Sequence, residues 1–305
     1  MAQRTSFSMA WDPTLLASFL AVAETRTVSA AAKLLHASQP AVSAHIQSLE
    51  RQLGTALFRR SVRGMELSDT GRRLVDHARR IQRLVDDVAA DLGSAKEPSG
   101  RLLLAASTTL AAHVVPPILA AFAARYPDVS IRMDVGNTDE ILERVRQGRV
   151  PLGIVEGLGR APQVQLRPFV DDEILPVSAP SVAARIRRPA DLRRFPILWR
   201  EVGSGTRAVL ERALLRAGLT KDDIAVRYEL GSTEAITSAV IAGMGVGFLS
   251  EWSIRTEIAQ RQLVPLPFAG LRIPRTFRWA IGAGALSGLA ALFFDFANRH
   301  VPRVR

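Results

Sequence analysis

The sequence predicts a two-part chain, in which a helical region with a short β-hairpin and a long helix precedes an α/β domain of two lobes. Three observations lead to this fold class. The chain has 305 residues, about twice the length of an average domain. Apolar residues before position 70 recur with helical spacing. Beyond position 100, strand-like and helix-like segments alternate, which is typical of parallel sheets with crossover helices.

The composition excludes several classes of protein. Hydrophobic residues make up 48% of the chain, which excludes a largely disordered protein. The absence of cysteine excludes disulfide scaffolds, thiolate zinc sites and cysteine nucleophiles, and it is compatible with a reducing compartment. The net charge of +11 favours a polyanionic partner. The charge is also concentrated locally, because residues 51–83 hold nine basic residues against three acidic ones.

Two apolar segments resemble targeting signals. Residues 15–23 follow Arg4 as in a secretory signal, but Leu16, Phe19, Leu20 and Ala23 have the spacing of one helix face, which favours a core helix. Residues 279–294 carry no charge but are too short to span a bilayer, so no membrane association is expected. An exported periplasmic solute-binding protein is the alternative function that this start leaves open.

Residues 27–54 predict two short helices joined by a tight turn. Ala31 and Ala32 give the first helix a small-residue face, and Ser38 caps the second. The buried stripe of the second helix is predicted at Val42, Ile46, Leu49 and Leu53. Its opposite face presents uncharged polar and small groups: Gln39, Pro40, Ser43, Ala44 and Gln47. Such a face suits reading of base edges in the major groove of double-stranded DNA, and a merely solvated helical hairpin is the alternative.

A basic hairpin is predicted next. Residues 57–60 and 65–67 read as two short strands around a glycine-containing turn. Arg59, Arg60 and Arg63 are placed there to contact DNA phosphates, as in the wing of a winged helix-turn-helix.

A long helix is predicted from Ser68 or Asp69. Apolar residues recur in it with a heptad pattern, at Leu74, Ala78, Ile81, Val85, Val88 and Leu92. This seam predicts a homodimer, with packing against its own chain as the alternative. The predicted domains are residues 1–68, a winged helix-turn-helix; residues 69–99, a linker helix with a Gly, Ser and Pro-rich hinge; and residues 100–305, the two-lobed domain.

These motifs together resemble one family. Ala31-Ala32, Ser38 through Ser43, Leu49-Glu50, Leu53-Gly54 and Leu57-Phe58-x-Arg60 closely resemble the winged helix-turn-helix of LysR-type transcriptional regulators. The resemblance implies groove-reading positions at Gln39, Pro40, Ser43 and Ala44, a wing contact at Arg60, and an effector domain built like a type 2 periplasmic binding protein. It also implies a cytoplasmic homotetramer, a palindromic promoter site and contact with RNA polymerase.

The α/β region is predicted to form two lobes linked by crossing strands. In the first lobe, strands are expected at 102–106, 129–135 and 152–155, with a helix over 109–125 that Pro116-Pro117 distorts. In the second, separate strands are expected at 164–167 and 174–178, followed by strands at 196–200 and 225–230.

Hydroxyl-rich segments open helices in both lobes. Ser107, Thr108 and Thr109 follow the first strand, and Ser204, Gly205, Thr206 and Arg207 follow the strand that ends at Arg200. Free N–H groups and the positive end of a helix dipole favour an anion, and Arg207 adds a charge. Asn137 and Thr138 open a third helix. The sequence therefore predicts a small anionic effector in a cleft between the lobes, unless the hydroxyls are only helix caps.

The effector segments at 106–109, 136–138, 155–157, 200–207 and 231–234 resemble the LysR branch that contains regulators of sulfur assimilation and carbon fixation. That resemblance implies a small anion or a phosphorylated metabolite as effector. Phosphate-loop, zinc-protease and serine-hydrolase motifs are absent, so the protein is not expected to be an enzyme, and neither a cofactor nor a metal site is predicted.

Overall fold

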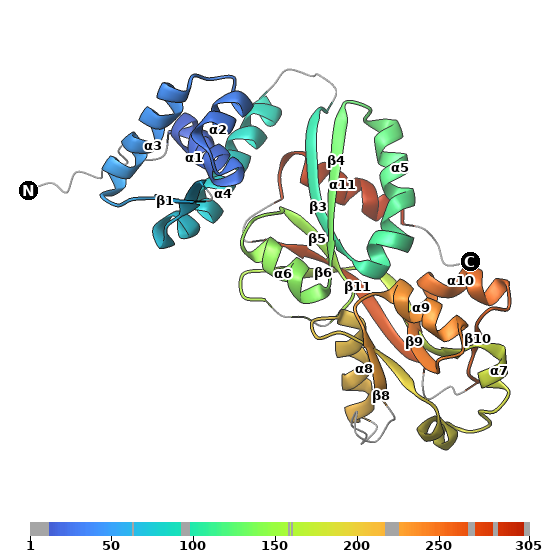
Figure 1. Ribbon diagram of the computed structural model, residues 1–305. Helices are drawn as coiled ribbons and strands as arrows, with labels where there is room; N and C mark the ends of the chain where they lie inside the picture. Colours follow the sequence, from blue (N-terminus) through green and yellow to red (C-terminus); the bar gives the residue numbers. More distant parts are fainter. Residues whose placement is uncertain are drawn as a thin grey trace, which may run out of the picture. The chain divides into compact units, whose positions relative to one another are not determined.

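The computed structural model describes residues 12–62, 64–92, 98–157, 159, 161–216, 226–267, 272–282 and 286–301 (Figure 1). The chain divides into two compact units, residues 1–96 and 97–305.

The N-terminal unit is built from three helices, a hairpin and a fourth, longer helix. These elements are α1 (Pro13–Thr25), α2 (Val28–Leu34), α3 (Gln39–Leu53), β1 (Phe58–Ser61), β2 (Gly64–Leu67) and α4 (Asp69–Leu92). Asp12, Thr27 and Ser38 cap the first three helices by accepting backbone N–H groups. Leu16, Phe19 and Val22 of α1 are fully buried. The apolar run at 15–23 is therefore a core helix, as its spacing predicts.

The hairpin is attached to the helices by specific contacts. Its strands pair antiparallel from Phe58↔Leu67 to Ser61↔Gly64. The Glu50 carboxylate at the end of α3 accepts the Leu57 N–H at 2.7 Å, and the Met65 N–H donates to the Arg26 carbonyl oxygen at 2.8 Å. A side chain is not tolerated at Gly64, because a Cβ there would lie 2.6 Å from that same carbonyl oxygen. The wing is thus held against α1 and α3.

The structure corrects the predicted seam of α4. Leu74 and Ala78 are buried in the core of the N-terminal unit together with α1 residues, and Ile81 packs against that core. Val85 is 39% exposed and Leu84 is 61% exposed. The first half of the heptad stripe is therefore used within the chain, because the three-helix core needs a fourth apolar face. The side chains of Val88 and Leu92 lie outside the described residues.

The C-terminal unit contains one hydrogen-bonded sheet of nine strands. The strands are β3 (Gly100–Ser107), β4 (Val129–Gly136), β5 (Leu152–Val155), β6 (Gln165–Ser178), β7 (Ile197–Arg200), β8 (Val226–Leu230), β9 (Val246–Ser250), β10 (Val264–Pro265) and β11 (Ile273–Ile281). Eight of them follow the order β4-β3-β5-β11-β6-β9-β7-β8, and β10 pairs with β6. The pairs β3–β4 and β7–β8 are parallel, whereas β6 and β11 run antiparallel to each other.

Helices cover this sheet in two groups (Figure 1). The first comprises a π-helical turn η1 (Leu110–Val114), α5 (Val115–Arg125), α6 (Thr138–Arg146) and α11 (Gly288–Arg299). The second comprises α7 (Pro180–Ala183), η2 (Pro189–Arg194), α8 (Gly205–Arg216), α9 (Thr233–Ile241) and α10 (Glu251–Ala259). The predicted distortion near Pro116-Pro117 is present as the π-helical turn directly before α5.

Separate apolar cores define two lobes. Phe122, Trp279 and Phe293 belong to the core of the first lobe, around β3 to β5. Trp199, Leu210 and Phe248 belong to the core of the second, around β7 to β9. The long strands β6 and β11 run through both lobes and connect them.

The prediction of two separate strands at 164–167 and 174–178 is wrong, because both lie in the single strand β6. In the sequence, Pro168 and the acidic residues after it favour an interruption between two strands. Pro168 instead lies opposite Arg278, at an irregularity in the pairing with β11. Asp172 can be buried in the strand because Arg275 compensates its charge and the Ser250 hydroxyl donates a hydrogen bond to it. Within the described parts of the chain, no helix is long and apolar enough to cross a membrane.

We expect the two leucines on α4 to differ sharply in their contribution to stability. Leu74→Ala empties a buried position and should lower the local free energy of unfolding by about 2–5 kcal/mol. Leu84→Ala, on the exposed side of the same helix, should change it by less than about 0.5 kcal/mol. Hydrogen–deuterium exchange of peptides from α1 and α4 in the full chain measures both. Equal protection in the two variants would contradict the assignment of Leu74 to the domain core.

Candidate functional site

The face of α3 that the sequence predicts to read DNA is accessible. Gln39, Pro40, Ala44 and Gln47 are exposed, and Ser43 is half-buried. Val42, Ile46 and Leu49 fix the opposite side of the helix in the core. Capping by Ser38 leaves the first turn, with its polar and small side chains, at the free end of the helix. This surface offers amide, hydroxyl and methyl groups to base edges, with no charged group at its start.

The wing offers the basic part of the same unit. Arg59 is exposed on β1. The Arg60 backbone pairs with Met65, whereas the Arg60 side chain and the whole of Arg63 lie outside the described residues. The DNA-contact assignments of these three arginines stay predictions.

Three threonine hydroxyls from the two lobes meet in the C-terminal unit. Thr108 and Thr109 follow β3, and Thr233 opens α9. The Thr233 Oγ1 atom lies 3.4 Å from Thr108 Oγ1 and 3.2 Å from Thr109 Oγ1. The buried guanidinium of Arg200 donates from Nη1 to Thr233 Oγ1 at 2.8 Å, while Glu201 neutralises its charge. The predicted residues Thr108, Thr109 and Arg200 are thus brought together by Thr233, which lies in the segment 231–234 but was not predicted as a site residue.

The helix starts of both lobes do contact one oxyanion, and it is the protein's own Glu156. This carboxylate follows β5 and is buried. Its Oε1 atom accepts the Thr109 N–H at 2.8 Å, and its Oε2 atom accepts from the Thr206 hydroxyl at 2.8 Å. Two of the groups predicted to bind an effector anion are therefore occupied by an internal anion. Sequence reasoning missed Glu156, although an acidic residue directly after a four-residue apolar strand was its signal.

Glu156 belongs to a buried ionic network between β6 and β11. Arg275 donates from Nε to Asp172 at 2.6 Å and from Nη1 to the Thr206 hydroxyl at 2.9 Å, and Nη1 lies 3.4 Å from Glu156. Asp172 also accepts from the Ser250 hydroxyl at 2.8 Å. The network joins strands and helix starts that lie far apart in the sequence.

The charge balance of this network keeps Glu156 ionised. Burial would raise the pKa of the Glu156 carboxyl, but the positive charges of Arg275 and Arg200 oppose this effect. The hydrogen bonds from Thr206 and Thr109 act in the same direction and hold the pKa of Glu156 below its ordinary value. The carboxylate is therefore a fixed negative charge of the folded domain at neutral pH.

Arg207, which the sequence predicts to bind the effector, is paired within the second lobe. Its guanidinium pairs with Glu211 at 2.8 Å and with Glu229 at 2.9 Å, and it donates to the Arg200 carbonyl oxygen at 3.1 Å. These carboxylates raise the pKa of Arg207, although burial acts against them. These contacts connect α8 with β7 and β8, and the assignment of Arg207 to an effector anion stays a prediction.

The remaining predicted residues act mainly as caps and close contacts. Asn137 caps α6 and donates to the Val202 carbonyl oxygen at 3.3 Å, which joins the two lobes. Ser107 donates to the Ile154 carbonyl oxygen, and Ser204 accepts the Arg207 N–H. Thr138 is buried, and its hydroxyl has no hydrogen-bond partner among the described residues.

Gly205 permits contact between the lobes. A Cβ on Gly205 would lie 2.4 Å from Thr138 Oγ1 and 2.7 Å from the Gly157 nitrogen. The groups that approach this glycine so closely belong to the other lobe. Among the residues that the structure describes, no cluster of His, Asp or Glu side chains could hold a metal ion.

A winged helix-turn-helix carried on one chain with a two-lobed α/β domain defines a class of DNA-binding regulators that respond to a ligand. Comparison with known families agrees with this class. Residues 13–72 match the bacterial regulatory helix-turn-helix of the lysR family, and residues 95–302 match the LysR substrate binding domain. The chain therefore belongs to the family of LysR-type transcriptional regulators, which are not enzymes.

Individual relatives agree with the predicted branch. The chain is 32% identical to the HTH-type transcriptional regulator CysL of Bacillus subtilis over 254 residues, 82% of this chain and 84% of the relative. It is 34% identical to a probable RuBisCO transcriptional regulator of Emiliania huxleyi over 236 residues, 75% of each chain. The CcmR regulatory domain of Synechocystis PCC6803 in complex with 2-PG is 28% identical, with a TM-score of 0.58, and the match covers 67% of this chain and 98% of that domain.

Removing the charge of Glu156 should destabilise the C-terminal unit. Glu156→Gln removes one of the two carboxylates beside the buried Arg275 and leaves the Thr109 N–H and the Thr206 hydroxyl without a charged acceptor, so we expect the free energy of unfolding to fall by about 1–3 kcal/mol. Glu143→Gln is a matched control, because it removes a half-exposed ion pair with Arg146 and should cost less than about 1 kcal/mol. Urea unfolding of the full chain at pH 7 measures both.

The pH dependence provides a second test of the same network. The pKa of Glu156 is lowered by folding, so its contribution is present above the unfolded-state pKa of about 4.3 and is lost as the pH falls through the folded-state value. The stability difference between wild type and Glu156→Gln should therefore narrow in acid. A difference that stays constant from pH 7 to pH 3 would show that Glu156 does not act through its charge.

Proposed function

We propose that this LysR-type regulator acts in the cytoplasm as a homodimer or homotetramer that binds promoter DNA, and that a small anionic effector between its lobes alters that binding. The DNA contacts are assigned to the exposed face of α3, with Gln39, Ser43 and Gln47 as its polar groups, and to the arginines of the wing. Contact with RNA polymerase belongs to the same proposal.

The observation that carries the effector proposal is the meeting of Thr108, Thr109 and Thr233 between the lobes. The Thr108 and Thr109 hydroxyls follow β3, and the Thr233 hydroxyl lies at the start of α9. Arg200 also donates a hydrogen bond to the Thr233 hydroxyl. Hydroxyls at helix starts can donate to an oxyanion, and the helix dipole favours its charge. The unpartnered hydroxyl of Thr138 is a further donor at a helix start, beside Gly205.

The proposed mechanism is a shift between lobe arrangements. Thr233 bonds Thr108 and Thr109 across the lobes, and Asn137 bonds Val202. An effector that replaces some of these bonds binds one arrangement better than another, and only this difference in affinity can change the equilibrium. The ionic network of Glu156 and Arg275 lies beside these bonds and joins β11 to both helix starts.

The proposed self-association uses the part of α4 that the domain core leaves free. Val85 of the predicted seam is 39% exposed and lies one turn beyond Ile81. An apolar stripe on a long helix favours pairing with a second copy of the same stripe. We therefore assign the homodimer contact to the second half of the predicted seam, from Val85 onward.

Base reading by α3 can be tested with two matched double variants. Gln39→Ala with Ser43→Ala removes two of the three polar groups of the proposed reading face. Gln52→Ala with Ser48→Ala removes the same two residue types, which bond each other elsewhere on α3. We expect the first variant to lose about tenfold or more in affinity for the upstream promoter DNA but little for random DNA, and the second to lose neither. Mobility shifts at two salt concentrations measure this. Equal loss on all DNA would contradict base reading.

The effector site can be tested by the thermal stability of the full chain in sulfite, sulfate, thiosulfate, phosphate or a sugar phosphate. An anion that binds the folded state should raise Tm in a concentration-dependent way. Thr108→Val and Thr233→Val remove hydroxyl donors without changing side-chain shape and should weaken the apparent affinity about tenfold. Thr256→Val, at an exposed position of α10, should leave it unchanged. A Tm shift that survives both site variants would exclude this site.

A further inference from the structure

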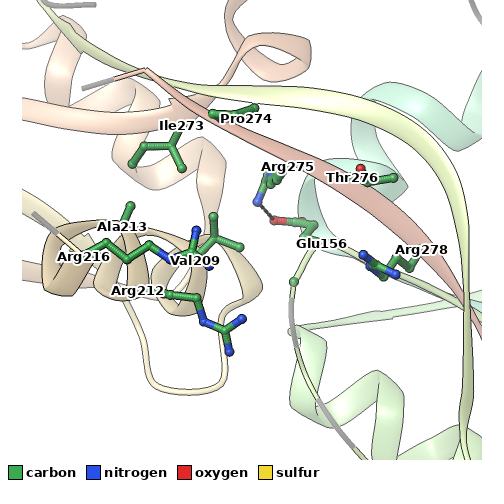
Figure 2. Close-up of a pocket in the computed structure, with 11 residues that line it drawn as sticks. Glu156, Val209, Arg212, Ala213, Arg216, Ile273, Pro274, Arg275, Thr276 and Arg278 are labelled. Carbon is green, nitrogen blue, oxygen red and sulfur yellow. Dashed lines mark hydrogen bonds and ion pairs between the residues drawn. The ribbon is translucent and has the colours of Figure 1, made fainter. Parts of the chain in front are cut away.

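A pocket lies where α8 passes β11. It has a volume of about 260 Å³. Arg212 and Arg216 of α8 and Arg275 and Arg278 of β11 all line it (Figure 2). Apolar side chains from the same two elements complete part of the wall, among them Val209, Ala213 and Ile273. The pocket thus combines four arginines with a small apolar surface.

The positive charge of this pocket is poorly compensated. Glu156 is its one acidic lining residue, and Thr109, Thr206 and Arg275 already bond this carboxylate. Within the described parts of the chain, no carboxylate forms an ion pair with Arg212, Arg216 or Arg278. Arg272, directly before β11, does have such a partner in Glu173. A cluster of arginines around a cavity raises the local positive potential, which favours the binding of an anion there.

The buried arginine of the pocket provides a second, independent observation. Arg275 is 8% exposed, and its Nη2 atom has no hydrogen-bond partner among the described residues. Its other nitrogens are used by Asp172, Thr206 and Glu156. The wall of the pocket therefore carries a fixed guanidinium whose donors are not all satisfied.

This pocket is distinct from the hydroxyl cluster between the lobes. Thr206 lies at the start of α8, whereas Arg212 and Arg216 lie six and ten residues further along, about 9 and 15 Å along the helix axis. None of Thr108, Thr109, Thr233 or Arg200 lines the pocket. Glu156 and Arg275 line the pocket and also bond Thr109 and Thr206, so they connect the pocket with the helix starts between the lobes.

We propose that the pocket between α8 and β11 is a second ligand site, which binds a phosphate group held by Arg212, Arg216 and Arg278 against the wall of Arg275. Arginine forks match the geometry of phosphate oxygens and bind them in a bidentate way. The adjoining apolar side chains have room to cover the carbon part of a small phosphate ester. Free phosphate and a phosphorylated metabolite share this chemistry.

Binding in this pocket would be coupled to the arrangement of the lobes. The pocket includes α8 of the second lobe and β11, which runs through both, and Arg275 bonds Glu156 of the first lobe. A ligand that draws Arg212 and Arg216 toward β11 therefore favours the arrangement in which these elements are close. The coupling is reciprocal, so an effector between the lobes would change phosphate affinity by the same factor.

The test is a calorimetric titration of the full chain with inorganic phosphate and, separately, with glycerol phosphate. Arg212→Gln with Arg216→Gln should weaken binding at least about tenfold. Arg193→Gln with Arg194→Gln is the matched control, because it removes the same charge from exposed positions of η2 in the same lobe and should leave binding unchanged. Tighter binding of glycerol phosphate than of phosphate would identify a phosphorylated metabolite, and equal binding would identify free phosphate.

Several outcomes would overturn this proposal. Equal weakening by both double variants would mean that diffuse positive charge attracts the anion. Loss of binding in Thr108→Val with Thr233→Val, but not in Arg212→Gln with Arg216→Gln, would assign the phosphate to the inter-lobe site and support only the proposed effector. The absence of binding at millimolar phosphate in a wild-type chain of normal Tm would also exclude the second site.

Discussion

The C-terminal unit depends on one buried charge network, in which Arg275 stands between Asp172 and Glu156. Taking these charges out of water is costly, and only the mutual pairing and the hydrogen bonds from Thr206, Thr109 and Ser250 offset that cost. Removal of Arg275 would leave two buried carboxylates without the cation that they share. The network therefore fixes how β6, β11 and the helix starts approach one another, and it defines the surroundings of both proposed ligand sites.

This network also changes which groups are available to an effector. Helix starts in both lobes are suited to an oxyanion, but Glu156 already occupies the Thr109 N–H and the Thr206 hydroxyl. Arg207, the most evident cation in the sequence, is used by Glu211 and Glu229. The groups that remain are the hydroxyls of Thr108, Thr233 and Thr138, beside a neutralised Arg200. Recognition there would rest on directed hydrogen bonds more than on net charge.

In the N-terminal unit, local spacing and tertiary structure agree closely. The apolar stripes of α1 and α3 are buried as their spacing requires, and the polar face of α3 is exposed. The heptad stripe of α4 has two different environments along the helix. Leu74 and Ala78 are buried in the domain core, whereas Val85 is exposed. A periodic stripe shows which side of a helix is apolar, but it does not show which partner covers it.

The sequence by itself determined the family, the helix-turn-helix with its capping Ser38, and the alternation of strands and helices. These features depend on short-range spacing and capping, which neighbouring residues decide. Only the tertiary structure decided that Glu156 fills the oxyanion position, that Arg275 and Asp172 neutralise each other, and that Arg212, Arg216 and Arg278 gather at one pocket. Glu156 and Arg275 are 119 residues apart in the chain, and their approach depends on the pairing of β5 with β11, which no local pattern encodes.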